Sequence, residues 1–299
     1  MRPLIKYRTI FLITFFSWNC LPVFSQGEFN NWLFGSSAGI TFNYGNPVAL
    51  LNSAMNQTGR CPISVSDSLG ILLFYSSGNK VFSRNNVVMP NGSNIFGGID
   101  GSQPVISVKS FVNDSIYYLF TVGDNNWYSG GMCYSMLDMR LNSGYGDIVA
   151  TAKNIPIAGL QDARLTLTGT RHRNNHDVWI VTSIFNPTQQ YCAFLYTDAG
   201  ISTNLIFSPS LMGNAPISGM RFFLKFAPDG KKYIMGAFNM DQAEFGLFNN
   251  QTGSFNPLFL FKVVHGLDTL AVDRFEFSPD SKKLYATGFL PVSPLIDSL

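Results

Sequence analysis

Short apolar runs recur about every fifty residues, and this repeat restricts the possible folds more than any other feature of the chain. The runs are centred on positions 73, 119, 180, 234 and 285, so they recur after 46, 61, 54 and 51 residues. Each is short and rich in β-branched and aromatic residues, which favours a buried strand over a helix. The five runs are Ile71–Tyr75, Ile116–Phe120, Val178–Val181, Lys232–Met235 and Lys283–Ala286.

Turn signals divide each repeat into two hairpins. A polar turn rich in Asp, Asn, Ser or Gly, here called the leading turn, precedes every run, and a second turn signal follows in 141–144, 197–200 and 249–253. Two hairpins of this length make a four-stranded antiparallel sheet, so about five repeats predict an all-β β-propeller with little helix. The 14% aromatic content provides the apolar material for its core. The leading turns are 67–70, 113–115, 174–177, 228–231 and 279–282.

Segments 31–42, 64–92 and 134–148, with the turns at 228 and 279, resemble the N-terminal β-propeller region of large surface proteins from gliding bacteria with type IX secretion. The resemblance implies a secreted or surface-exposed propeller. Such proteins usually continue into immunoglobulin-like repeats and a C-terminal sorting domain, whereas this chain stops at Leu299, within its fifth repeat. We therefore expect either a truncated, incompletely closed ring or one closed by the strands near Trp32 and Ile40.

The N-terminus has the pattern of a secretory signal peptide. Three basic residues precede an apolar stretch that is too short to span a bilayer, and Val23 and Ser25 stand at the −3 and −1 positions. We expect residues 1–25 to be removed, so that the mature protein begins at about Gln26 and residues 26–299 form one propeller domain. Its predicted location is secreted or on the outer cell surface.

The net charge limits the classes of partner, and the cysteine content limits the number of disulfides. Removal of the leader lowers the formal charge from +2 to −1, which leaves no electrostatic footprint for nucleic acid or an anionic membrane. No later apolar stretch reaches transmembrane length. Cys61, Cys133 and Cys192 can form at most one disulfide within the mature chain, and we interpret them as small core residues whose disulfide state is open.

Two motifs suggest chemistry but lack the context it needs. Gly35–Gly39 matches the G-x-S-x-G pattern of serine hydrolases, yet a strand rather than a helix follows it, so a hairpin turn is the better interpretation. His172 and His176 have zinc-ligand spacing but lie in a polar turn, which indicates solvated side chains. The sequence therefore predicts no catalytic residue, no metal site and no cofactor.

Four positions resemble the short Asp-Ser/Thr-aliphatic acceptor of O-glycosylation in exported proteins of the same bacteria. The alternative is ordinary turn chemistry, because Asp and Ser both favour turns ahead of strands. The candidate acceptors are Ser68, Ser115, Thr269 and Ser298.

A ligand-binding loop is predicted at residues 124–131, where Trp127 and Tyr128 follow Asn125 and Asn126. Adjacent large aromatics in a polar, glycine-bearing loop suit a sugar or a partner side chain if they are exposed. The alternative is that the two rings fold back and cap the sheet.

Three functions agree with these features. The preferred hypothesis is a non-catalytic, adhesin-like binding module for an unknown glycan or protein at the cell surface, because no acid/base pair or activated nucleophile is recognisable. The alternative is a glycan-processing hydrolase or lyase, since propeller loops can bring distant residues together at the central channel. A truncated remnant of a larger surface protein is the third possibility.

Overall fold

Antiparallel strands make up nearly all the regular structure in the computed structural model. It describes residues 27–56, 62–98, 103–123, 130–185, 187–213, 221–238, 242–265, 268–269 and 271–289. The helical segments in these residues are η1 (Gly27–Phe29), α1 (Leu141–Gly144) and η2 (Ala150–Ala152). None is long and apolar enough to cross a membrane. The prediction of an all-β chain with minor helix is confirmed.

Four sheets, numbered here as blades 1 to 4, each contain at least four strands that pair antiparallel in chain order. In blades 2 and 3 the outermost strand is split into two pieces that pair with the same third strand. Blade 1 consists of β4 (Ile63–Ser66), β5 (Leu72–Ser76), β6 (Lys80–Ser83) and β7 (Val88–Ser93). Blade 2 consists of β8 (Val105–Lys109), β9 (Ile116–Val122), β10 (Met132–Asp138), β11 (Asp147–Ile148) and β12 (Ile155–Pro156).

The next two blades repeat this arrangement. Blade 3 consists of β13 (Thr168–Arg171), β14 (Val178–Phe185), β15 (Gln189–Thr197), β16 (Gly200–Ile201) and β17 (Ile206–Pro209). Blade 4 consists of β18 (Arg221–Phe226), β19 (Lys232–Phe238), β20 (Ala243–Asn249) and β21 (Ser254–Phe261). The short ribbon of β22 (Val264–His265) and β23 (Asp268–Thr269) follows, and β24 (Ala271–Phe277) then pairs with β25 (Leu284–Phe289) as the inner half of blade 5.

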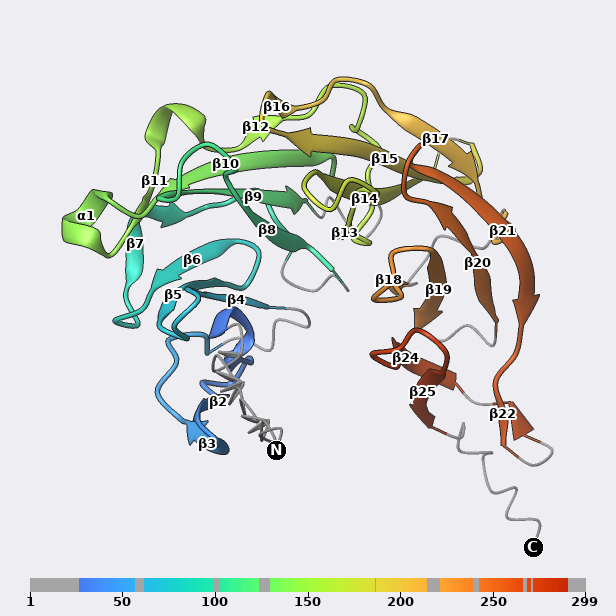
Figure 1. Ribbon diagram of the computed structural model, residues 1–299, viewed down its shortest axis with the longest axis horizontal. Coiled ribbons are helices and arrows are strands. Elements are labelled where there is room, and N and C mark those ends of the chain that lie inside the picture. Colours follow the sequence, from blue (N-terminus) through green and yellow to red (C-terminus); the bar gives the residue numbers. More distant parts are fainter. Residues whose placement is uncertain are drawn as a thin grey trace, which may run out of the picture.

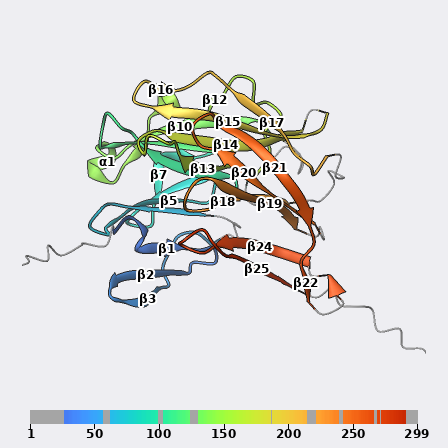
Figure 2. The same ribbon diagram turned by 45° about the vertical axis from the view of Figure 1, so that its right-hand side comes forward.

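The blades are arranged in an arc around a common centre, with the first strands β8, β13 and β18 on the inner side (Figure 1). Both views place the N-terminal strands and the C-terminal strands at the two ends of this arc (Figures 1 and 2). Radial four-stranded blades of this kind define a β-propeller, which is open in the described part of the chain.

The predicted repeat corresponds to a fixed place in each blade. All five apolar runs lie in second strands, namely β5, β9, β14, β19 and β25. The leading turns join first to second strands, and the turns at 141–144, 197–200 and 249–253 lead into the outermost strand. In each leading turn an Asp or Asn carboxyl or amide oxygen accepts a hydrogen bond from the backbone N–H two residues later. These residues are Asp67, Asn113, Asn174, Asp229 and Asp280.

Of the two expected forms of the ring, the one in which N-terminal strands complete the last blade is wrong for the described residues. β1 (Asn31–Leu33), β2 (Gly39–Tyr44) and β3 (Asn46–Leu50) form a sheet of their own beside blade 1. Asn31 holds it there, because its Nδ2 donates to Gly70 O at 2.7 Å and to the Oγ of Ser66 at 2.9 Å. These contacts attach the N-terminal strands to β4 and to the leading turn of blade 1.

The hydrophobic core lies between neighbouring blades rather than within one central layer. Each described junction contains an aromatic pair, one ring from each blade, at centroid distances that favour edge-on or offset packing. The four pairs are Phe74–Tyr117 at 5.2 Å, Phe120–Phe194 at 6.0 Å, Tyr191–Phe255 at 4.2 Å and Phe223–Phe275 at 5.8 Å. The near-continuous apolar runs follow from this geometry, because inner strands are covered on both faces.

Candidate functional site

The turns of blades 3 and 4 meet on one face of the propeller. Asn250 O, in the turn 249–253 of blade 4, accepts the backbone N–H of Arg173 at 3.0 Å and the indole N–H of Trp179 at 2.9 Å. The Arg173 guanidinium also donates to Gln251 Oε1 at 2.7 Å. The Trp179 ring is almost fully buried beneath this turn. These contacts fix the two turns relative to one another.

The leading turns of blades 4 and 5 are linked in a similar way. Asp229 N–H donates to the Oγ of Ser281 at 3.0 Å, and Lys232 Nζ donates to Asp229 Oδ2 at 2.9 Å and to Ser281 O at 3.1 Å. Partial burial alone would raise the pKa of the Asp229 carboxyl. Hydrogen bonds from Lys232 and from the Lys231 backbone outweigh it and lower that pKa, so the carboxylate is ionised at neutral pH.

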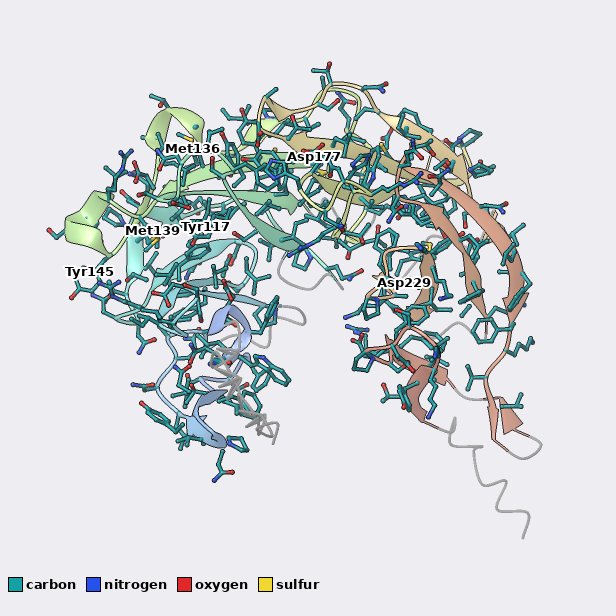
Figure 3. The ribbon with its side chains drawn as sticks, in the orientation of Figure 1. Tyr117, Met136, Met139, Tyr145, Asp177 and Asp229 are labelled. Carbon is teal, nitrogen blue, oxygen red and sulfur yellow. The ribbon has the colours of Figure 1, made fainter. Side chains whose placement is uncertain are left out.

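A groove of about 1000 Å³ runs between these turns. It extends from Asp229, on the inner side of the arc in Figure 3, to Asn256 on the outermost strand of blade 4. A smaller hollow of about 340 Å³ adjoins it and shares Asn175, Asp229 and Asn250. The groove is lined by Arg173, Asn175, Asp229, Lys231, Lys232, Leu247, Phe248, Asn249, Asn250, Gln251, Ser254 and Asn256.

The lining is polar, rich in amides and positive. Five of its side chains are carboxamides, which present a hydrogen-bond donor and an acceptor side by side. Three cations face one carboxylate, Asp229, so a negatively charged ligand is favoured over a positive one. Lys231 is exposed, and Leu247 adds a partly exposed apolar surface. Among the described lining residues, Asp229 is the one carboxylate and there is no histidine.

The predicted ligand loop lies outside the described residues. This applies to Asn125, Asn126, Trp127 and Tyr128 alike. Its flanks are described: Gly123 N–H donates to Gly131 O at 3.1 Å and so continues the β9–β10 hairpin. Exposure of Trp127 or Tyr128 therefore stays a prediction.

Of the candidate glycosylation acceptors, Ser68 is exposed in its leading turn and Ser115 is half-buried. The side chain of Thr269 and the whole of Ser298 lie outside what the structure describes. In the Ser68 turn, Asp67 Oδ1 accepts the backbone N–H groups of Leu69 and Ile71, each at 2.9 Å. Turn chemistry is thus present at this site, and modification of it stays a prediction.

The G-x-S-x-G segment forms the turn between β1 and β2. Ser36 and Ser37 have φ of 59° and 60°, and Phe34 N–H donates to Ala38 O at 2.8 Å. This is a hairpin turn without the strand-to-helix geometry that activates a nucleophilic serine.

His172 and His176 point to different blades. His172 Nε2 lies 3.3 Å from Gln251 O of blade 4, whereas the His176 ring packs on Phe111 of blade 2 with centroids 4.5 Å apart. His176 Nε2 lies 2.6 Å from Asp198 Oδ1, and this hydrogen bond raises the pKa of His176. Within the described ranges, no group of three His, Cys, Asp or Glu side chains could hold a metal ion.

Buried polar groups occupy the opposite end of the junction between blades 3 and 4. Glu244 is fully buried and accepts hydrogen bonds from Tyr191 and Tyr233 hydroxyls at 2.6 and 2.5 Å and from Ser210 Oγ at 2.6 Å. The buried guanidinium of Arg164 lies over the rings of Phe185 in blade 3 and Phe222 in blade 4, and desolvation lowers its pKa to about 10. Glu244 bridges two blades, and its full burial argues against contact with a substrate.

The groove was not apparent from the sequence. Its two sides lie more than fifty residues apart in the sequence, and Asn and Gln are ordinary turn residues. One local signal was present: Asn249, Asn250 and Gln251 follow one another, and a Lys-Lys pair stands at 231–232 in the preceding turn. Only the contact between blades makes this pattern a shared surface.

Several solved structures are similar to this chain. A scan of family models and a search of curated proteins gave no match. The periplasmic gluconolactonase PpgL of Pseudomonas aeruginosa is similar at 13% identity and a TM-score of 0.36, covering 63% of this chain and 51% of the other, so the match spans about half of that protein. A candidate 6-phosphogluconolactonase of Bacteroides fragilis is similar at 13% identity and a TM-score of 0.39, covering 86% and 85%. A second candidate 6-phosphogluconolactonase, from Bacteroides uniformis, is similar at 12% identity and a TM-score of 0.33, and the match covers 71% of each chain.

Proposed function

We propose that this chain is a non-catalytic binding module that holds a hydroxyl-rich, negatively charged ligand, such as an acidic glycan, in the groove between blades 3 and 4. The observation that carries the proposal is the groove itself: about 1000 Å³ with five carboxamides, three cations and one carboxylate. Carboxamides match vicinal hydroxyl groups, and the excess of cations matches carboxylates on the ligand.

The rigidity of the groove supports binding without a large ordering cost. Arg173 and Trp179 of blade 3 are both hydrogen-bonded to Asn250 O of blade 4, so the two sides are held in position before a ligand arrives. The export and the cell-surface location expected from the N-terminal residues remain part of the proposal. So does the relationship to propeller regions of type IX-secreted surface proteins.

The direct test is titration of the mature chain with a short oligogalacturonate, using a neutral galacto-oligosaccharide of equal length for comparison. Lys231→Met should weaken oligogalacturonate binding about tenfold, because it removes an exposed cation from the groove. Lys282→Met is the matched control, since Lys282 has the same place in the leading turn of blade 5 but lies outside the groove. Equal affinities for the charged and neutral oligosaccharides, or equal loss in both variants, would contradict the proposal.

A propeller hydrolase is the second candidate function. Proteins named as gluconolactonases are among the similar structures, so gluconolactone is the substrate to test first. The binding proposal expects no acceleration over spontaneous hydrolysis, because the groove holds a single carboxylate. Turnover that disappears in Asp229→Asn would favour the hydrolase over the binding module. A folded chain that shows neither affinity nor turnover would favour the third hypothesis, a truncated remnant of a larger surface protein.

A further inference from the structure

β25 leaves one edge without a described partner. In blades 1 to 4 the second strand pairs on both sides, with the first and the third strand, whereas β25 pairs with β24 alone. Residues 285–288 along β25 are exposed. Unpaired backbone N–H and C=O groups along an edge are a template for another strand.

Blade 4 faces the sheet of blade 5, and its surface is apolar in the region that strands added to β25 would cover. Phe245 on β20 stands opposite Phe259 on β21, with ring centroids 5.5 Å apart, and Phe261 lies next to Phe259 at 6.0 Å. Phe259 is 50% exposed, and Phe245 and Phe261 are only half-buried. On the same face, Ile234 of β19 is fully buried against β24, so exposure begins where blade 5 ends.

Blade 3 shows what covers the equivalent face. Its third-strand residues Tyr191 and Ala193 are fully buried. They pack in one cluster with Phe248 and Phe255, which belong to the β20–β21 hairpin of the next blade. The surface made by the β25 edge and the Phe245–Phe259–Phe261 face therefore has the width of two strands. A single added strand would leave Phe259 or Phe261 uncovered.

We propose that this surface accepts a β-hairpin from another polypeptide, which pairs with β25 as a third strand and covers Phe259 with a fourth. The hairpin presents alternating apolar side chains to blade 4. Its third strand runs antiparallel to β25, so its turn lies beside the exposed Lys282 and Lys283, and a turn that carries Asp or Glu fits best.

A second copy of this chain does not fit the surface. Antiparallel pairing of β25 with its symmetry mate places the two-fold axis perpendicular to the sheet, which keeps both blades 4 on the same side. Each blade 4 already covers its own β24 and extends over the added strands, so the two would overlap. A hairpin without a blade attached to that side avoids this clash.

The experiment uses two synthetic hairpin peptides and the mature chain. One peptide has the sequence of residues 243–261, which forms the outer hairpin of blade 4, and the other carries Asn250→Asp and Gln251→Glu in its turn. We expect binding that slows amide hydrogen exchange in residues 284–289, with the acidic-turn peptide several-fold tighter at low salt. If the free peptide does not form a hairpin, a fused variant replaces it. In this variant a second copy of residues 239–261 follows directly after Phe289.

The matched control is a second exposed phenylalanine on an outer strand. Phe259→Lys should weaken peptide binding about tenfold or more, whereas Phe207→Lys on β17, where Phe207 is 47% exposed, should leave it unchanged. Unchanged exchange in residues 284–289 for both peptides and the repeated-hairpin variant would overturn the proposal, as would equal effects of the two substitutions. A dimer in the free chain with these amides already protected, or protection lost on deletion of residues 290–299, would also overturn it.

Discussion

Asn250 shows how a single carbonyl oxygen joins two blades. It accepts hydrogen bonds from the backbone N–H of Arg173 and the indole N–H of Trp179. These two hydrogen bonds from blade 3 hold the turn of blade 4 that contains Asn250. The same turn supplies carboxamides to the groove. At the residue scale, the contacts that stabilise a blade junction and those that shape the groove therefore come from one segment.

Cys133 and Cys192 provide a test of burial at single positions. Both are buried in strands, as predicted, and both are free thiols. Burial raises the pKa of Cys133 and raises the pKa of Cys192 to about 12. Because the thiolate is the nucleophile, neither should react with iodoacetamide at pH 8 in the native protein. The measurement is mass spectrometry of a Cys61→Ser variant, with the same protein in urea as the control. Rapid labelling of either thiol without denaturant would contradict the burial.

The His176–Asp198 pair predicts a pH dependence of stability. The hydrogen bond raises the pKa of His176 in the folded chain, so its stabilising contribution is complete below the unfolded pKa of about 6.5 and is lost as pH rises through the folded value. His176→Gln should therefore lower the melting temperature more at pH 5.5 than at pH 8.5. The effect is small, because both partners are exposed.

Packing of His176 on Phe111 does not depend on charge, so a constant difference at both pH values would assign the whole effect to packing. Asp198→Asn should reproduce the pH dependence without changing that contact.

At the scale of elements, turns with positive φ fix the hairpins. Gly253 has φ of 78°, and a Cβ at this position would lie 2.6 Å from the Trp179 ring. Gly253→Ala should therefore destabilise the fold by about 2–4 kcal/mol, from backbone strain and overpacking together. Gly200 has φ of 99° in the corresponding turn of blade 3, with open space around it, so Gly200→Ala should cost only about 1–2 kcal/mol. Equal losses in urea unfolding would show that the Trp179 contact does not matter.

Elements were predictable where their chemistry is local. The leading turns and second strands followed from Asp or Asn ahead of short β-branched runs, and all five lie where expected. The separate sheet β1–β3 was missed, because its position depends on Asn31 bonding to Ser66 and Gly70 across distant sequence. The groove was missed for the same reason, since Arg173 and Asn250 meet only when two blades pack.

At the scale of the whole molecule, the blades form an open arc whose junctions differ in exposure. The junction between blades 3 and 4 is covered along its length and bears the groove on one face. The junction between blades 4 and 5 is covered only on its inner half. The described part of the molecule thus has two different surfaces: a polar groove, where we propose that a charged ligand binds, and an apolar edge, where we propose that a polypeptide hairpin pairs.

The most direct measurement of the central claim is amide hydrogen exchange across the full mature chain, with and without a short oligogalacturonate. We expect slower exchange in segments 171–177, 228–232 and 247–256, which together contain all the groove-lining residues named above. Binding accompanied by protection only around residues 124–129, with these three segments unchanged, would place the ligand at the Trp127–Tyr128 loop and contradict the groove as the binding site.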